Sequence, residues 1–504
     1  MNLSAHLAFT NGNILTMEDD LPHATAMAVY GGKIIFVGNA EDVQAFTSDH
    51  TEVVDLQGKT LLPGFIDAHT HLLRTGMELT LYVDLETPSL DDLLQKVEAT
   101  VKEREAGQWV VGRGWDESQW STSDYPTKDD LDNIAPDHPV VLIRVCGHIV
   151  SVNSKALEMV PVKDDPATVD RPNGWLREES AWNFLDQIEP DLEDRLEALE
   201  AGIAHAHSCG ITSIHEIADW HAVQTYMALQ KQGKLNLRVR LNVLHKILDH
   251  FIGAGLSGEF GNKFLSIAAL KMFADGSIGA RNAALFKPYA DAPETNGMLN
   301  YKQSDLEQWM RKGHESGFQL MTHAIGDRAI EAVIDAYEAV GITPADRARI
   351  EHLEMPTDAQ LERMEKMQII ASMQPNFVQW SGSGKLYEQR LGTERDAHID
   401  PHRRVLNHNV PLAFSSDSMP VNVLYGLHQV VNAPYENQRL SVEEALKAYT
   451  LGGAYARFDE HYLGSIKVGK RADLVVLDRN PLESSGELDQ LNVEQTYVAG
   501  QRVK

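Results

Sequence analysis

The sequence predicts an α/β fold: a (β/α)8 TIM-type barrel, with a small β-sandwich domain built from both termini and a large insertion after the first barrel strand. Two observations predict it. The middle of the 504-residue chain alternates short apolar runs with helical stretches, whereas both ends are rich in short β-prone runs separated by turns. This alternation indicates βα units around a parallel sheet, and eight such runs match the strand number of the barrel.

The terminal segments have the same β-rich character. Near the N-terminus, two β-prone runs, Ala26–Tyr30 and Lys33–Gly38, flank the pair Gly31-Gly32, which is a hairpin signal. Similar runs occupy residues 472–478 and 495–500. We therefore expect one β-sandwich domain assembled from residues 1–60 and 456–504.

The barrel is expected over residues 61–455, with helices between the strands, for example at 327–340 and 357–367. Its eight expected strands are residues 61–71, 210–216, 239–244, 267–273, 318–323, 349–353, 369–374 and 410–415.

The interval at about 73–205, between the first two strands, is too long for an ordinary βα connection and predicts an inserted subdomain. It contains one further strand-like run, at 139–145, and five of the eight tryptophans of the chain. Two explanations of the tryptophans stay open: they form the core of the subdomain, or some of them wall a substrate pocket.

Composition narrows the class of protein. The formal net charge of −28 argues against nucleic acid or anionic membrane as a partner, because phosphates would be repelled. Two cysteines cannot form a disulfide framework, and no apolar run is long enough to span a bilayer. We expect a cytoplasmic enzyme with a small-molecule substrate, and leave open whether it is a homo-oligomer.

Several barrel strands end in residues that suit a metal site. His69 and His71 alternate along the first strand, so both point to the same face, together with Asp67. The later strands end in Lys271, His323, His352 and Asp417. Each of these residues, taken singly, is better explained as a satisfied core or surface residue. Together, at the strand ends where barrel enzymes place their active sites, they predict a metal centre, and imidazole and carboxylate ligands suit Zn²⁺.

These residues lie in motifs that resemble the amidohydrolase superfamily, and within it the YtcJ-like branch, amidohydrolase family 3. The resemblance covers essentially the whole chain. The motifs are L-P-G-F-I-D-A-H-T-H (62–71), G-H-I-V-S-V-N-S-K-A-L (147–157), G-I-T-S-I-H-E (210–216), K-M-F-A-D-G-S-I-G (271–279), H-A-I-G-D-R-A (323–329), F-S-S-D (414–417) and G-S-I-K-V-G-K-R-A-D-L-V-V-L-D (464–478).

The resemblance implies one or two divalent ions, with Zn²⁺ expected. His69, His71 and Asp417 would hold one ion, and His323 and His352 would hold a second or complete a single site. A protonated lysine would repel a cation, so Lys271 would instead carry CO₂ as N6-carboxylysine and bridge two ions. The alternative is a lysine that pairs with a carboxylate such as Asp275 or faces solvent.

The implied reaction is hydrolysis of a carbon–nitrogen bond other than a peptide bond, in an amide or cyclic amide. Metal-bound hydroxide would attack, since coordination lowers the pKa of water to about 7. Asp417 would act as general base and then as general acid, and His215 would help polarise the substrate carbonyl. The alternatives are ester or lactone hydrolysis or isomerisation on the same metal site, and a non-catalytic amidohydrolase-like scaffold.

Further polar and aromatic residues are candidates for substrate contacts. Arg281 would suit a substrate carboxylate, and Asp327 would serve equally well as the N-cap of a helix. The full set is His148, Asn153, Trp115, Asp275, Arg281 and Asp327.

Overall fold

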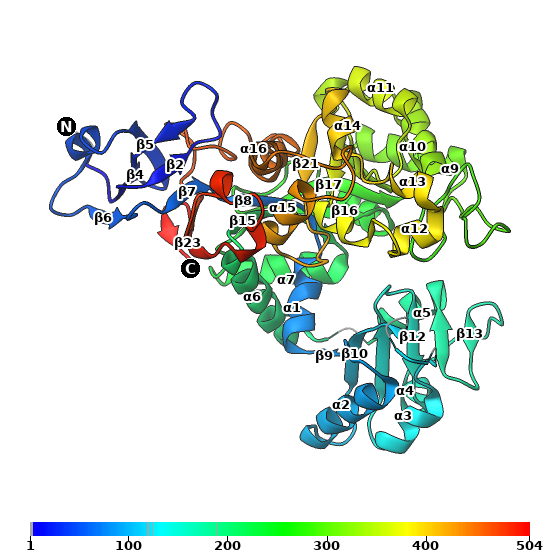
Figure 1. The fold of residues 1–504 in the computed structure, drawn as a ribbon. Coiled ribbons are helices and arrows are strands. Elements are labelled where there is room, and N and C mark those ends of the chain that lie inside the picture. Colours follow the sequence, from blue (N-terminus) through cyan, green and yellow to red (C-terminus); the bar gives the residue numbers. More distant parts are fainter. Residues whose placement is uncertain (1–3, 118–119, 123, 189) are drawn as a thin grey trace. The chain divides into compact units, whose positions relative to one another are not determined.

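The computed structural model describes residues 4–117, 120–122, 124–188 and 190–504 (Figure 1). The chain forms two compact units. One contains Met1–Leu72 and Ile203–Lys504, and the other contains Leu73–Gly202. The second unit covers most of the interval in which the sequence places an insertion.

The first unit contains an eight-stranded sheet in which every pair of hydrogen-bonded neighbours is parallel. This nearly closed barrel confirms the predicted α/β class. In sheet order the strands are β8 (Phe65–Thr70), β15 (Ile211–Ala218), β16 (Arg238–Leu244), β17 (Leu265–Phe273), β18 (Gln319–Ala324), β19 (Arg349–His352), β20 (Ile370–Met373) and β21 (Leu412–Phe414).

The seam between the last strand, β21, and the first, β8, is joined by one carboxylate. Asp67 is buried, and it accepts hydrogen bonds from the backbone N–H of Ser416, at 3.0 Å, and from the Ser416 hydroxyl. Just beyond it, the N–H of Asp417 donates to the carbonyl of His69 at 2.9 Å. The closure of the barrel therefore places Asp417 beside His69.

Helices cover the outside of the barrel. The expected helix at 327–340 is α10, and α9 and α10 pack on β18. The other expected helix begins at Asp358 because Thr357 is its N-cap, in a capping box with Gln360. The principal helices are α7 (Trp220–Lys231), α9 (Gln303–Glu315), α10 (Asp327–Val340), α11 (Asp358–Met367), α14 (His402–Asn407), α15 (Val423–Val431) and α16 (Val442–Lys447).

Two further sheets lie at the ends of the chain: one contains N-terminal strands alone, and the other combines strands from both ends. The predicted hairpin is present as the antiparallel pair β4 and β5. One sheet has the order β5 (Lys33–Gly38), β4 (Ala26–Tyr30), β1 (Leu7–Thr10), β6 (Glu52–Asp55). The other has the order β24 (Gln501–Arg502), β23 (Val493–Val498), β22 (Leu474–Leu477), β7 (Thr60–Pro63), β2 (Asn13–Leu15), β3 (His23–Ala24).

The expected single strand at 61–71 is wrong in one respect, because the chain changes sheets at Gly64. The N–H of Gly64 donates to Asp473 in the terminal sheet at 2.8 Å, whereas the N–H of Phe65 donates to Gly210 in the barrel at 3.0 Å. Residues Thr60–Pro63 therefore form β7, which pairs with β22, and the barrel strand begins at Phe65.

A buried ion pair also connects the terminal sheet to the barrel. Arg238, the first residue of β16, donates through Nη2 to Asp473 at 2.9 Å and through Nε to the other carboxylate oxygen. Both side chains are almost completely buried. The same carboxylate accepts the N–H of Ala499 at 2.8 Å, so it organises the last turn of the terminal sheet as well.

The second unit is a six-stranded mixed sheet with helices. The strand-like run at 139–145 is β11 in its interior. Trp115 and Trp120 lie in a buried cluster of this unit, which matches the core explanation, whereas Trp182 is 44% exposed. The strands are, in sheet order, β13 (Val169–Asp170), β14 (Trp175–Arg177), β12 (Ile149–Val152), β11 (Val140–Arg144), β10 (Val110–Trp115) and β9 (Val83–Asp84), and the helices include α2 (Leu90–Glu103), α3 (Lys128–Ile134), α4 (Ser154–Met159) and α5 (Glu178–Leu185).

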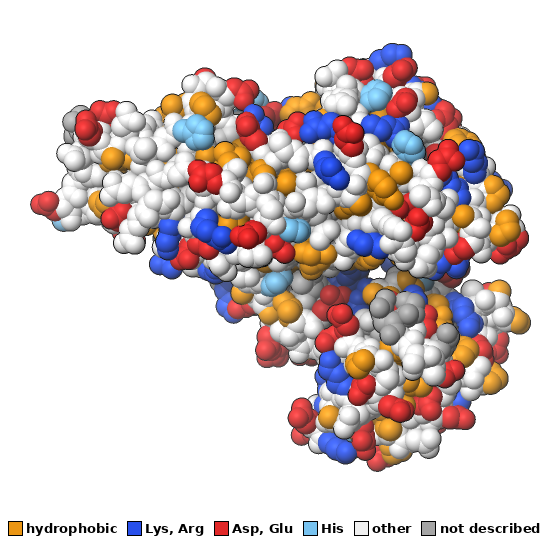
Figure 2. All heavy atoms as spheres, in the orientation of Figure 1, with side chains coloured by type: hydrophobic (Ala, Val, Ile, Leu, Met, Phe, Trp, Pro, Cys, Tyr) orange, Lys and Arg blue, Asp and Glu red, His pale blue; other side chains and the backbone are white. Residues whose placement is uncertain are grey.

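Acidic and basic side chains are interspersed over the face of the molecule drawn in Figure 2. Among the described residues, no helix combines the length and apolar character that a membrane crossing requires.

Gly64 provides a test of the sheet change. A Cβ atom at this position would lie 2.3 Å from Oγ1 and 2.4 Å from Cγ2 of Thr212, so Gly64→Ala should lower the free energy of unfolding by about 1–3 kcal/mol. Urea denaturation measures this change in the free energy of unfolding. Gly486→Ala is the control, because no atom lies within 4 Å of a Cβ built there. Equal stability of the two variants would contradict the close approach of Gly64 to β15.

Candidate metal centre

Three side chains from three strand ends converge at the carboxyl end of the barrel. His69 lies near the end of β8, His352 ends β19, and Asp417 follows β21. One ligand atom from each lies within 4.8 Å of the others. Two nitrogens and one carboxylate oxygen at this separation form a donor set that suits a divalent ion such as Zn²⁺.

A buried carboxylate determines which ring nitrogen of His69 carries the proton and which has a free lone pair. His69 Nδ1 lies 2.6 Å from Oε2 of Glu351, and both side chains are buried. Burial alone would raise the pKa of Glu351, but Arg349 and His69 hold that pKa well below its usual range. The carboxylate can only accept, so Nδ1 carries the proton of His69. Its Nε2 lone pair then faces Asp417, at 3.6 Å from Oδ1.

A side-chain amide determines the tautomer of His352 in the same way. Its Nδ1 lies 2.7 Å from Oε1 of Gln374, whose Nε2 donates to the hydroxyl of Ser415 at 2.9 Å. Nδ1 of His352 is therefore the donor, and Nε2 has a free lone pair. Burial, followed by the neighbouring His323, lowers the pKa of His352 well below 6.5 and keeps the ring neutral.

His352 also has an unusual backbone. Successive strand residues point to opposite faces, so His352 would face away from Glu351 if the strand continued. Instead His352 and Leu353 have φ angles of 73° and 50°, in the left-handed region that non-glycine residues rarely adopt. The backbone turn lets neighbouring residues of β19 contribute both a ligand and the partner of another ligand.

His323 is adjacent to this group. Its ring centroid lies 4.4 Å from that of His352, and its Nε2 lies 3.0 Å from the carbonyl oxygen of Gly276. A carbonyl only accepts, so Nε2 carries the proton and Nδ1 has the free lone pair. The carboxylate of Asp275 lies 3.3 Å from the same Nε2.

Asp417 and His71 face each other across the barrel seam, with Oδ1 of Asp417 3.1 Å from Nε2 of His71. Burial would raise the pKa of Asp417, but its hydrogen bond with His71 holds that pKa well below its ordinary value. Asp417 and Ser418 have φ angles of 51° and 60°, so this ligand too lies on left-handed backbone.

Lys271 lies inside the barrel on β17 and is completely buried. Its Nζ has no hydrogen-bond partner among the described residues, and lies 4.7 Å from the ring centroid of Phe273. Burial lowers its pKa to about 8, against the opposing effect of Glu351 and Asp417. The alternative pairing with Asp275 is not observed, because that carboxylate accepts three backbone N–H groups, from Ala284, Ile325 and Gly326.

His215, on β15, is also completely buried. Its Nδ1 lies 3.0 Å from Nη1 of Arg349, a group that can only donate. Nε2 therefore carries the proton. Burial, followed by Arg349, lowers the pKa of His215 well below 6.5. The ring is a neutral donor, which is the form that polarisation of a carbonyl requires.

The loop candidates for substrate contacts have partners within the chain. Asp275 holds the three backbone groups named above and neighbours His323. Asp327 accepts from the N–H groups of Phe286, at 2.8 Å, and Arg328, at 2.9 Å, and the N-cap of α10 is Gly326 rather than Asp327. Arg281 forms a two-point ion pair with Asp291, at 3.0 and 2.7 Å. Substrate contacts by these residues stay predictions.

The other three candidates lie in the second unit. Asn153 is completely buried, caps α4 and exchanges four hydrogen bonds with backbone groups. Trp115 is completely buried in a core cluster, and its indole N–H donates to Glu117 at 3.2 Å. His148 lies 2.9 Å from a carboxylate oxygen of Glu178. These contacts give Asn153 and Trp115 structural tasks, and a role in substrate binding stays a prediction for all three.

The sequence reasoning missed the residues that orient the ligands: Arg349, Glu351 and Gln374. One signal was available. In the run R-I-E-H, two charged residues alternate inside a short strand expected to be buried, which places both on one face of that strand. Charges in a barrel interior need partners, and the strand-end histidines are the nearest candidates.

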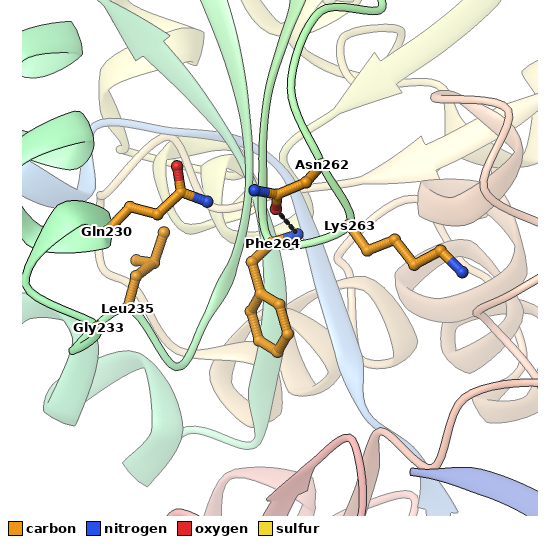
Figure 3. Close-up of a pocket in the computed structure, with 6 residues that line it drawn as sticks. All are labelled: Gln230, Gly233, Leu235, Asn262, Lys263 and Phe264. Carbon is orange, nitrogen blue, oxygen red and sulfur yellow. Dashed lines mark hydrogen bonds between the residues drawn. The ribbon is translucent and has the colours of Figure 1, made fainter. Parts of the chain in front are cut away.

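A surface hollow lies at the other end of the barrel strands (Figure 3). Its volume is about 450 Å³. Asn262, Lys263 and Phe264 immediately precede β17, so they lie at its amino end, whereas the candidate metal ligands lie at carboxyl ends. Asn262 accepts the N–H of Phe264 at 2.8 Å, as drawn in Figure 3. The remaining lining residues are Gln230, Gly233 and Leu235.

Comparisons with known proteins point to one family. Residues 52–504 match the family described as "Amidohydrolase family". The chain is 31% identical over 525 residues to the putative amidohydrolase YtcJ of Bacillus subtilis, covering 98% of both chains. It is 30% identical over 538 residues to the N-substituted formamide deformylase of Arthrobacter pascens, covering 98% of this chain and 97% of that protein.

Among solved structures, the chain is similar to an uncharacterised metal-dependent hydrolase from Pyrococcus horikoshii. The TM-score is 0.82 at 30% sequence identity, with 94% of this chain and 98% of that chain covered.

An ion bound at this candidate centre would make the stability of the protein depend on metal. Addition of Zn²⁺ to chelator-treated protein should raise the free energy of unfolding by about 2.7 kcal/mol when free Zn²⁺ is a hundredfold above its dissociation constant. In His352→Ala, at the same Zn²⁺ concentration, most of this gain should be lost. Thermal unfolding with and without Zn²⁺ measures the gain.

The control is His245→Ala. His245 follows β16 and contacts Tyr301 at 3.1 Å, outside the candidate donor set. This variant should keep the full Zn²⁺-dependent gain. An equal gain in His352→Ala and wild type would remove His352 from the ligand set.

Proposed function

The chain belongs to the amidohydrolase family, and from that membership we propose that it is a metal-dependent hydrolase of carbon–nitrogen bonds other than peptide bonds, with an amide or cyclic amide as substrate. The observation that carries the proposal is the convergence of His69, His352 and Asp417, with ligand atoms within 4.8 Å and two imidazole lone pairs left free by their partners. The Arthrobacter pascens relative is a formamide deformylase, and a formamide is an amide.

The ligand assignment follows the strand ends. His69, His71 and Asp417 would hold one divalent ion, and His323 and His352 a second, or the set would share a single ion. Lys271 would join as N6-carboxylysine. The support is its buried amine, which has no hydrogen-bond partner in the part of the chain that the structure describes. When bound, such an ion supplies Lewis acidity and lowers the pKa of water to about 7.

The protein's own groups would move the protons. Asp417 takes a proton from the attacking water and returns it to the departing nitrogen, so that amide and water give carboxylic acid and amine. Its low pKa favours the carboxylate that this task requires at the start. His215, neutral and protonated at Nε2, donates to the carbonyl oxygen as negative charge develops there.

The decisive experiment is a substrate panel. Metal-replete protein should hydrolyse members of a set of N-acyl amino acids and cyclic amides, and activity should disappear after chelation and return with Zn²⁺. Activity confined to lactones or esters would replace the amide assignment with ester hydrolysis on the same centre. If the purified protein contains no divalent ion and hydrolyses no member of the panel, the non-catalytic scaffold is favoured.

Asp417→Asn tests the proton-transfer role. Turnover should fall by about 10²–10⁴-fold, the usual contribution of a positioned acid or base, while the protein stays folded. Steady-state rates and metal content are measured together, because Asp417 is also a candidate ligand. The control is Asp459→Asn, since Asp459 has the same 16% side-chain exposure and pairs with Arg240. Wild-type turnover by Asp417→Asn would exclude the role.

Lys271→Ala tests the carboxylated lysine. The variant should lose bound metal, and short carboxylic acids such as acetate should restore part of the metal content and activity by replacing the carbamate. Elemental analysis gives the metal content. The control is Lys470→Ala, which removes a largely buried lysine that donates to Ser465. It should keep its bound metal, and acetate should have no effect on it. Full metal content in Lys271→Ala would count against a bridging carbamate.

A further inference from the structure

Arg349 and Glu351 form an ion pair inside the barrel that neither the mechanism nor the family motifs account for. Both lie on one face of β19 and both are completely buried. Nε of Arg349 donates to Oε1 of Glu351 at 2.9 Å, and Nη2 donates to Oε2 at 3.1 Å. The pair is therefore bidentate, the geometry that orients both groups most strictly.

The guanidinium of Arg349 also connects other strands. The two hydrogens of Nη2 are shared among three acceptors: Oε2 of Glu351, the carbonyl of Ala68 on β8 at 2.6 Å and the hydroxyl of Ser372 on β20 at 3.0 Å. Nη1 faces Nδ1 of His215 on β15 at 3.0 Å. The guanidinium thus makes hydrogen bonds to β8, β15 and β20 as well as to its own strand, and cannot change orientation without breaking several of them.

The ion pair presents opposite chemistry to two histidines. On one side, a carboxylate oxygen of Glu351 meets Nδ1 of His69 at 2.6 Å, and a carboxylate accepts. On the other, an N–H of Arg349 meets Nδ1 of His215, and a guanidinium only donates. The same ring atom is consequently a donor in His69 and an acceptor in His215.

We propose that Arg349 and Glu351 are positioning residues of the metal centre, which fix His69 as the Nδ1–H tautomer and His215 as the Nε2–H tautomer. His69 then offers its Nε2 lone pair to an ion, and His215 offers its Nε2–H to a substrate oxygen. A histidine ligand is commonly oriented by a carboxylate on its other nitrogen, and loss of that partner costs about 10–100-fold in metal affinity. The inference rests on the proposed function only in that a divalent ion serves as one readout.

Removal of Glu351 alone would leave Arg349 buried without its counterion, which can prevent folding. The test therefore replaces the pair with apolar residues, a change that proteins often tolerate. In Arg349→Met/Glu351→Leu, the Zn²⁺ affinity of chelator-treated protein, measured by competition with a chromogenic chelator, should fall about 10–100-fold. In Arg349→Met/Glu351→Gln, the amide oxygen can again accept from His69, and part of the affinity should return.

The matched control is a second buried bidentate pair, Arg238 with Asp473. Arg238→Met/Asp473→Leu removes an ion pair of similar geometry and burial between β16 and the terminal sheet, and should keep the wild-type Zn²⁺ affinity. Wild-type affinity in Arg349→Met/Glu351→Leu would overturn the proposal, as would equal affinities of that variant and Arg349→Met/Glu351→Gln. If wild-type protein binds no Zn²⁺, the proposed function fails instead.

A second measurement keeps the ion pair of Arg349 and Glu351 intact, so it does not depend on whether a variant without the pair can fold. Ring ¹⁵N NMR of metal-free wild-type protein labelled at histidine distinguishes the two tautomers, with His69→Gln and His215→Gln used to assign the signals. We expect protonated Nδ1 in His69 and protonated Nε2 in His215. The same tautomer in both rings, or the reverse assignment, would overturn the proposal whatever the metal affinity.

Discussion

The ion pair of Arg349 and Glu351 is the constraint on which the barrel interior depends. Charges removed from water cost several kcal/mol each unless nearly every donor and acceptor finds a partner. The partners here come from β8, β15 and β20 as well as from the strand that carries the pair. The registers of these strands must therefore agree with one another, because a shift of one residue in any of them would remove a partner.

The candidate ligands also lie where the backbone departs from regular structure. His352 and Asp417 both have positive φ angles, conformations that cost of order 1–3 kcal/mol for a residue with a side chain. The hydrogen bond from Asp417 to the His69 carbonyl and the contact of His352 with Gln374 hold these conformations in place. The strain brings side chains from different strands to one point, which regular strand alternation would not achieve.

Much of the barrel could be predicted because its physical signal is local. An apolar run followed by a histidine or an aspartate is visible in the sequence at several strand ends. The change of sheet at Gly64 has a weaker signal, the dipeptide Pro63-Gly64, which marks a turn but does not show that the two strands belong to different sheets; the hydrogen bonds to Asp473 and Gly210 show this. The orientation of His352 was likewise hidden, because alternation along β19 predicts the opposite face.

The loop residues show a different limit. Asp275 and Asp327 have the polarity expected of substrate-binding groups, yet the structure shows their carboxylates bonded to backbone N–H groups of the two loops that follow β17 and β18. A polar side chain in a loop meets two demands, the chain's need for hydrogen bonds and the substrate's, and composition cannot separate them. The amine of Lys271 differs from both carboxylates, because it is buried and its Nζ has no hydrogen-bond partner among the described residues. A buried polar atom without a partner costs about 1–3 kcal/mol. The amine of Lys271 therefore lowers the stability of the barrel, and it does so at the place where the chemistry is proposed to occur.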